Sequence, residues 1–295
     1  INRVPQERAS SLATMRSVVE VSAARVLRGS AEPWQNLAYA GCGVALAFLP
    51  DSSPQEVLSA CQKIKSFGIR DVTCHVPARR FKSVDELRGF LSELRLDTGV
   101  SKVLALGGDG IPMGELTTAS QVIQVLSESP ANFKRVGIAG YPQGNTKIPN
   151  CVLKEALVEK VGSLGGMDVD WHIVSQLCVD ATAILNWVKV LEKISYSTSR
   201  SIEVELGIFG PNSFSKLRRI SRRVKFSEEL EDQVRRLEQS MTASPSPTMY
   251  TPTNLIQELR LRHQSSRVKF TGLHITTFDK VLPTLEWLSR SSTFR

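Results

Sequence analysis

Eight polar or ionisable residues of this chain stand in or just after short apolar runs. Glu20 lies in the run R-S-V-V-E-V-S, and Asp109 follows V-L-A-L-G-G. A carboxylate at the end of a barrel can have a raised pKa and act as a general acid. Gly107 and Gly108 would let a flat or charged ligand approach the backbone. The eight candidates are Glu20, His75, Asp109, Tyr141, Gln143, Asn145, Gln176 and Asp180.

Each candidate also has a purely structural interpretation. Glu20 could face outward from its strand, since its apolar neighbours would then point to the opposite face. Asp109 could stabilise a turn, and His75 could be a satisfied core histidine. Asp180 fits the N-cap of the helical pattern that follows it. No Walker loop, nucleophile elbow or H-E-x-x-H motif accompanies these residues, so spacing alone does not choose between the interpretations.

The elements that must position these residues form a repeated pattern. Short apolar runs of strand type recur along the chain, and most are separated by a helical pattern. Eight such units predict a single-domain (β/α)8 barrel, whose active site lies at the C-terminal ends of the strands. The alternative is an open doubly wound sheet, but no G-x-G-x-x-G follows the first strand. The expected strands are 16–22, 43–48, 72–76, 102–106, 135–140, 171–177, 202–208 and 269–275.

The remaining segments are a polar start and one Pro/Ser-rich stretch. Residues 1–15 are expected to form an N-terminal arm, and the barrel is expected to occupy residues 16–295. The stretch A-S-P-S-P-T-M-Y-T-P-T at 243–253 predicts a mobile loop within the barrel domain, not a domain boundary. No apolar run reaches about 18 residues, so no membrane span is expected.

The chain has a formal net charge of +8, and part of it comes from one segment. This basic segment suggests an anionic partner such as RNA, an acidic lipid or an acidic protein. It could equally be the solvated face of a helix, because no stacking aromatic residues are interleaved. Its cations are Lys216, Arg218, Arg219, Arg222, Arg223 and Lys225.

The five cysteines are scattered and odd in number, and most lie in apolar runs. They are expected to be reduced core thiols in a reducing compartment. No C-x-x-C pair or His/Cys cluster indicates zinc, and no metal is expected. The chain starts at Ile1 and is basic there, which would suit import into the mitochondrial matrix; the cytoplasm is the alternative.

Eight motifs in order resemble the methylenetetrahydrofolate reductases, particularly the short flavin barrel without a regulatory domain. The resemblance extends from Arg16 to about Phe294. It implies that hydride passes from NAD(P)H via FAD to 5,10-methylenetetrahydrofolate in a ping-pong reaction. The motifs are V-V-E-V-S-A-A-R (18–25), A-F-L-P-D (47–51), C-H-V-P-A-R-R (74–80), L-A-L-G-G-D (104–109), V-G-I-A-G-Y-P-Q-G-N (136–145), V-S-Q-L-C-V-D (174–180), G-I-F-G-P (207–211) and G-L-H-I-T-T-F (272–278).

The resemblance also implies roles for individual residues. Glu20 would be the general acid that protonates the folate N10 as the five-membered ring opens. Asp109 would lie near the flavin N1–C2 edge and the pterin, and Gln176 would contact the folate or the nicotinamide. Lys160 would face the flavin pyrophosphate. Further FAD contacts would come from His75, Gly107, Gly108, Tyr141 and Asn145.

Three segments depart from the family pattern. Gln143 and Asn145 replace a Glu and a His, and the His is expected to help hold FAD. The usual F-G-G is F-D-K at 278–280, and A-A-R at 23–25 replaces P-P or P-R. These departures suggest an alternative function: a barrel without catalysis that serves as a structural subunit of a larger mitochondrial assembly, RNA-containing or respiratory. A homo-oligomer is a further possibility for the partners.

Overall fold

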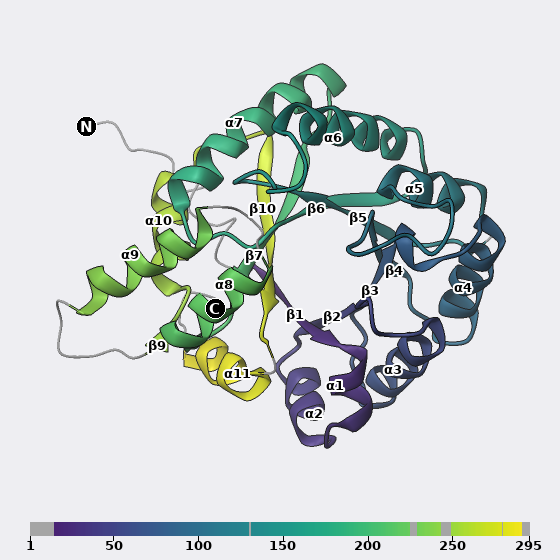
Figure 1. Cartoon of the computed structure of the whole chain (residues 1–295), viewed down its shortest axis with the longest axis horizontal. Helices are drawn as coiled ribbons and strands as arrows, with labels where there is room; N and C mark the ends of the chain where they lie inside the picture. Colours follow the sequence, from purple (N-terminus) through teal and green to yellow (C-terminus); the bar gives the residue numbers. More distant parts are fainter. Residues whose placement is uncertain (1–14, 130, 225–228, 243–248, 279, 291–295) are drawn as a thin grey trace, which may run out of the picture.

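The computed structural model describes residues 15–129, 131–224, 229–242, 249–278 and 280–290. Within them, eight parallel strands close into a barrel, in the order β1-β10-β7-β6-β5-β4-β3-β2 (Figure 1). The predicted (β/α)8 barrel is confirmed, and the open doubly wound sheet is wrong because β10 pairs with β1. The strands are β1 (Arg16–Ser22), β2 (Gly43–Ala47), β3 (Val72–Pro77), β4 (Lys102–Leu106), β5 (Arg135–Gly140), β6 (Asp170–Ser175), β7 (Ile202–Phe209) and β10 (Val268–Thr276).

Helices surround the barrel in Figure 1 and cover the outer face of its strands. Their starts follow local sequence chemistry. At α3, Ser53 and Glu56 form a capping box and Pro54 opens the first turn. The helices are α1 (Ala23–Arg28), α2 (Glu32–Tyr39), α3 (Pro54–Ser66), α4 (Val84–Leu96), α5 (Ala119–Glu128), α6 (Asn150–Gly165), α7 (Ala181–Thr198), α8 (Phe214–Val224), α9 (Leu230–Thr242), α10 (Thr253–Arg262) and α11 (Val281–Arg290).

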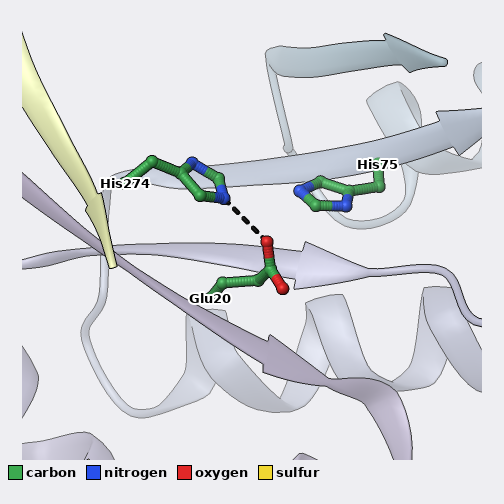
Figure 2. A group of neighbouring side chains, drawn as sticks. All are labelled: Glu20, His75 and His274. Carbon is green, nitrogen blue, oxygen red and sulfur yellow. Dashed lines mark hydrogen bonds and ion pairs between the residues drawn. The ribbon is translucent and has the colours of Figure 1, made fainter. Parts of the chain in front are cut away.

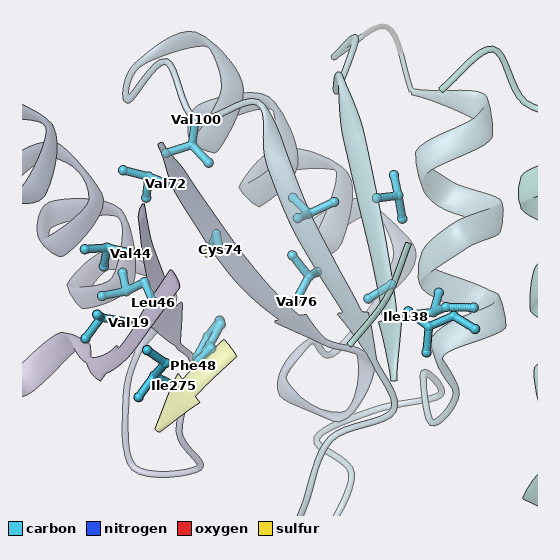
Figure 3. Close-up of a cluster of buried hydrophobic side chains, with 14 of the residues drawn as sticks. Val19, Val44, Leu46, Phe48, Val72, Cys74, Val76, Val100, Ile138 and Ile275 are labelled. Atoms are coloured by element: carbon cyan, nitrogen blue, oxygen red, sulfur yellow. The ribbon is translucent and has the colours of Figure 1, made fainter. Parts of the chain in front are cut away.

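Side chains alternate between the two faces of each barrel strand, as strand geometry requires. Glu20, His75 and His274 point into the barrel and approach one another there (Figure 2). The outward interpretation of Glu20 is therefore wrong. Its neighbours along β1 instead belong to the core between barrel and helices (Figure 3). That outer core includes Val19, Leu46, Cys74, Val76, Ile138 and Ile275.

Charged side chains occupy the N-terminal end of the barrel. Asp71, just before β3, accepts hydrogen bonds from Arg16 at 2.7 Å and from Lys102 at 2.8 Å. Glu205 of β7 lies 3.4 Å from Arg16 Nη1 and 3.5 Å from His172 Nε2. A buried charge is tolerated when it is paired in this way. The network therefore fills the floor of the barrel with paired charges and leaves the opposite end for a site.

Helices α8 and α9 add a second apolar cluster at the C-terminal end of the barrel. Leu217 of α8 and Val234 of α9 pack with Leu177 and Phe209. Leu177 follows β6, and Phe209 is the last residue of β7. A two-stranded sheet, β8 (Asn212–Ser213) with β9 (Met249–Tyr250), lies beside them. This sheet and helix α1 were not predicted. Two-residue strands carry no periodic pattern, and six-residue helices carry very little.

Several predictions concern residues outside the described ranges. The N-terminal arm, except its last residue, and residues 243–248 of the Pro/Ser-rich loop fall there, so both stay predictions. Among the helices that the structure describes, none is long and apolar enough to span a bilayer. In the same residues all five cysteines are free thiols, and four are buried.

Candidate active site at the barrel mouth

Glu20 and two histidines form a compact cluster inside the barrel. His274 Nε2 lies 2.9 Å from Glu20 Oε2, and the His75 and His274 rings stack with centroids 5.7 Å apart. Figure 2 shows the two imidazoles side by side above the carboxylate. Both histidines are buried, with 7% and 4% of their surface exposed. A carboxylate and two imidazoles in contact are suited to storing and transferring a proton.

Barrel closure brings this cluster together. Strand β10 pairs with β1, so that Val18 lies opposite His274 and Glu20 lies opposite Thr276. On the other side β2 places Ala45 beside Glu20. Because that alanine is small, it leaves room between β1 and β3 inside the barrel. The Thr277 hydroxyl donates to the Glu20 carbonyl at 3.2 Å and fixes the end of β10 against β1.

The Glu20 carboxyl is held ionised. Burial alone would raise its pKa, but the hydrogen bond from His274, and the positive charge that His274 and His75 can carry, hold the pKa below its ordinary value. The expected raised pKa of Glu20 is therefore wrong. An ionised carboxylate can only accept, so the shared proton lies on His274 Nε2.

His75 is the neutral member of the cluster. Burial lowers its pKa to about 4, although the Glu20 charge opposes the shift. Its Nε2 is buried and has no hydrogen-bond partner among the described residues. A buried unpaired ring nitrogen is costly. Among the described residues, His75 is therefore not a satisfied core histidine.

The loop after β4 forms one side of the mouth. Gly108 has a φ of +90°, and a Cβ there would lie 2.7 Å from the Pro77 Cβ. The Gly107 carbonyl accepts from Arg79 N at 3.1 Å. Asp109 follows on the exposed rim. Burial raises the pKa of Tyr141 at the end of β5, and the Asp109 charge raises it further, so these two residues lie near each other.

Lys160 and Gln176 approach the same end from α6 and from the loop after β6. Lys160 is buried, and its Nζ donates to the Ala139 carbonyl at 3.5 Å. Burial lowers the pKa of Lys160 to about 8. The Gln176 backbone N–H donates to the Gly140 carbonyl at 2.7 Å, and its side-chain oxygen accepts from Leu177 N. No hydrogen bond from its side-chain amide N–H groups is found among the described residues.

Gln143, which departs from the family pattern, has a protein partner. Gln143 Nε2 donates to Gln233 Oε1 of α9 at 2.7 Å, and Gln233 Nε2 donates to Asp180 Oδ2 at 3.3 Å. Asp180 also accepts from the first turn of α7, which confirms its N-cap interpretation. The Asn145 side-chain oxygen accepts from Lys147 N at 2.8 Å, within a turn. These contacts stabilise the loop after β5 through α9 and through its own turn.

His274 is the residue that the strand-end criterion missed. It lies two residues before the end of β10, although it shares the inward face with Thr276. A search of every inward position would have included it. Glu20, His75 and His274 each offer one metal-ligating atom within 4.8 Å of the others. The Glu20–His274 hydrogen bond occupies two of these atoms.

Part of the basic segment is paired within the protein. Arg218 lies 3.0 Å from Glu238 and Arg222 lies 2.6 Å from Glu231, both on α9. Lys216 donates to the Phe278 carbonyl. Arg219 is exposed, and a shallow surface depression of about 500 Å³ lies between these arginines. Lys225 and the Arg223 side chain lie outside the described residues, so an anionic partner stays a prediction.

The fold and the site together are those of a single-domain (β/α)8 barrel with an acid–base cluster in its mouth, the architecture that the motifs had indicated. The chain belongs to the methylenetetrahydrofolate reductase family, whose family model matches residues 50–291. Glu20 lies before the matched range, so its role rests on the geometry and on the motif around it.

Two solved structures show the same fold at low sequence identity. One is an uncharacterised protein from Clostridium thermocellum that binds two copies of 5-methyl-5,6,7,8-tetrahydrofolic acid. It is 12% identical, with a TM-score of 0.58 over 98% of both chains. The other, described as a phosphonomutase from Burkholderia cenocepacia J2315, is 10% identical, with a TM-score of 0.50 over 96% of both chains.

Proposed function

We propose that this chain is a reductase of the methylenetetrahydrofolate reductase type that transfers hydride from NAD(P)H via FAD to 5,10-methylenetetrahydrofolate. The observation that carries the proposal is the Glu20–His274–His75 cluster in the mouth of a barrel of this family. The folate bound by the Clostridium thermocellum protein supports a folate ligand for the same fold.

The residues at the mouth fit a flavin in part. Lys160 is buried with no carboxylate within ion-pair distance among the described residues, which suits a pyrophosphate. The orphaned His75 Nε2 suits a polar ligand group, and Gly108 brings the backbone close to the ligand space. FAD, when bound, would accept and donate the hydride. Tyr141 and Asn145 would complete its contacts.

The chain's own residues would orient the folate and supply a proton. Glu20 would deliver a proton to the folate N10 from its inward position on β1. Asp109 would lie on the rim beside the pterin, where its charge also affects the flavin. The free amide N–H groups of Gln176 would donate to the folate or to the nicotinamide. Holding these groups in place before the substrate arrives is what lowers the barrier.

The first test is flavin binding by the purified full chain, followed as quenching of FAD fluorescence. We expect saturable binding, weakened about tenfold or more in Lys160→Met because a charge-assisted contact is lost. Lys154→Met is the matched control, since Lys154 is exposed on the same helix. Absence of saturable FAD binding by the unmodified chain would exclude a flavin reductase, while calorimetry with 5-methyltetrahydrofolate tests the folate site separately.

A second candidate function is a non-catalytic structural subunit of a larger mitochondrial assembly. The observation in its favour is that Gln143 is bonded to Gln233, and Asn145 to its own turn, where the family pattern has a Glu and an FAD-contacting His. In this case native extracts of isolated mitochondria would contain the chain only in a large particle. Migration as a monomer or small homo-oligomer would contradict the subunit function.

A further inference from the structure

On the inward face of the barrel, His274 lies between the buried Glu205 and Glu20, whose side chain is 24% exposed. Its Nε2 is 2.9 Å from Glu20 Oε2 toward the mouth. On the floor side, the charge that His274 can carry helps to lower the pKa of Glu205. The ring is 4% exposed and stacks on His75. An imidazole held between carboxylates is a proton carrier that solvent reaches poorly.

We propose that His274 is the positioning residue for Glu20: it orients the carboxylate through its Nε2–H and resupplies the proton that Glu20 gives to the substrate. This inference rests on the proposed function for the identity of the substrate. It assigns a role to a residue outside the strand-end candidates. It also resolves a conflict, since a carboxylate held ionised has no proton of its own to donate.

The proton transfers balance without a further reactant. At rest Glu20 is ionised, and the shared proton lies on His274 Nε2. With substrate bound, this proton moves to Glu20 Oε2 along the 2.9 Å hydrogen bond, and a solvent proton that binds at His274 Nδ1 keeps the ring neutral. As the N10–CH2 bond of the folate breaks and hydride reaches the carbon, Glu20 passes the proton to N10 and becomes a carboxylate again. Loss of the Nδ1 proton to solvent and uptake of one at Nε2 then restore the resting pair.

Three other groups act on this pair and set its pH dependence. His75 faces Glu20 from β3, and its positive form would favour the ionised carboxylate. The Thr276 hydroxyl of β10 also bonds to Glu20 and favours that form. Glu205 faces His274 from β7. Among these groups His274 alone both bonds to Glu20 and has a titratable ring, so its removal should have the largest effect.

The first experiment measures Glu20 protonation in the full chain without any ligand. Infrared spectra across the acidic range detect the C=O stretch of protonated carboxyl groups, and the Glu20 band is the one lost in Glu20→Gln. We expect His274→Leu to raise the midpoint of this band by about one unit or more. His274→Gln, which can still donate, should show a smaller rise. His263→Gln, at the far end of α10, should show none.

The second experiment follows the folate half-reaction against pH. Both His274 variants should lower its rate about tenfold or more, since Gln orients but cannot resupply a proton. Flavin reduction by NAD(P)H should be unchanged. An unmoved Glu20 band in His274→Leu, with circular dichroism showing a folded chain, would overturn the proposal. A moved band without any folate reduction by the unmodified chain would support the orienting role and contradict the proposed function.

Discussion

Two inward-facing carboxylates of the same barrel are kept ionised by different means. The imidazoles of His274 and His75 lower the pKa of Glu20. The pKa of Glu205 is lowered by a hydrogen bond from His172 and by the fixed charge of Arg16. Arg135 Nε donates to His172 Nδ1 at 3.0 Å, so His172 carries its proton on Nε2 and donates it to Glu205. One carboxylate can therefore exchange protons while the other stays a structural anion.

Glu205→Gln should destabilise the protein by about 3 kcal/mol at pH 7, because it removes the anion that pairs with Arg16 and accepts from the buried His172. Burial opposes ionisation, but His172 and Arg16 lower the pKa of Glu205 from 4.5 to about 2. Its contribution is therefore complete above pH 4.5 and is lost as the pH falls toward 2. Urea unfolding at several pH values should show the variant and the unmodified chain converging in acid.

The control for that prediction is Glu203→Gln. Glu203 pairs with Arg135 at 2.8 Å, but 42% of its side chain is exposed. An exposed pair of this kind contributes less than about 1 kcal/mol. Equal losses for the two variants, or a Glu205→Gln effect that persists at pH 2, would contradict the account of the barrel floor.

At the scale of elements, β6 and β7 pair only briefly. Two residue pairs are in register, and then Ser175 Oγ accepts from Gly207 N at 2.8 Å in place of a backbone carbonyl. A Cβ on Gly207 would lie 2.0 Å from the Ser175 carbonyl oxygen. The glycine is therefore required by the close approach of the two strands, just before the loop that carries Gln176.

Gly207→Ala should cost about 2–3 kcal/mol, because the backbone of β6 must move to admit the methyl group. Gly162→Ala is the matched control: Gly162 lies in α6 with nothing near its Cβ position, so the alanine should be neutral or stabilising by up to about 1 kcal/mol. Thermal unfolding of the two variants measures the difference. A neutral Gly207→Ala would show that the strands are not tightly apposed.

The strands were predictable because each carries a local apolar pattern. β1, β4 and β5 have the predicted bounds, and the other barrel strands differ by one or two residues at one or both ends. The Glu20–His274 contact joins residues 254 positions apart. Only the lateral pairing of β10 with β1 creates it, and no local pattern encodes that pairing. The strand-end criterion therefore found Glu20 and His75 but not the histidine between Glu20 and the barrel floor.

At the scale of the whole molecule, the barrel separates stability from chemistry. Paired charges occupy the floor, and the outer apolar core joins strands to helices. The mouth holds the unpaired His75 nitrogen, the buried Lys160 and the shared proton of Glu20 and His274. Helices α8 and α9 lie over part of the same end and connect through Gln233 to the loop after β5. Binding at the mouth should therefore be sensitive to this helical pair.

The most direct measurement of the central claim separates the two half-reactions in Glu20→Gln. FAD should remain bound and should be reduced by NAD(P)H at the rate of the unmodified chain, because Glu20 is needed only for the proton. Reduction of 5,10-methylenetetrahydrofolate, and its reverse with 5-methyltetrahydrofolate, should fall by about a hundredfold or more. Stopped-flow absorbance of the flavin reports both steps. Equal loss of both half-reactions would show that Glu20 is structural and would contradict the account.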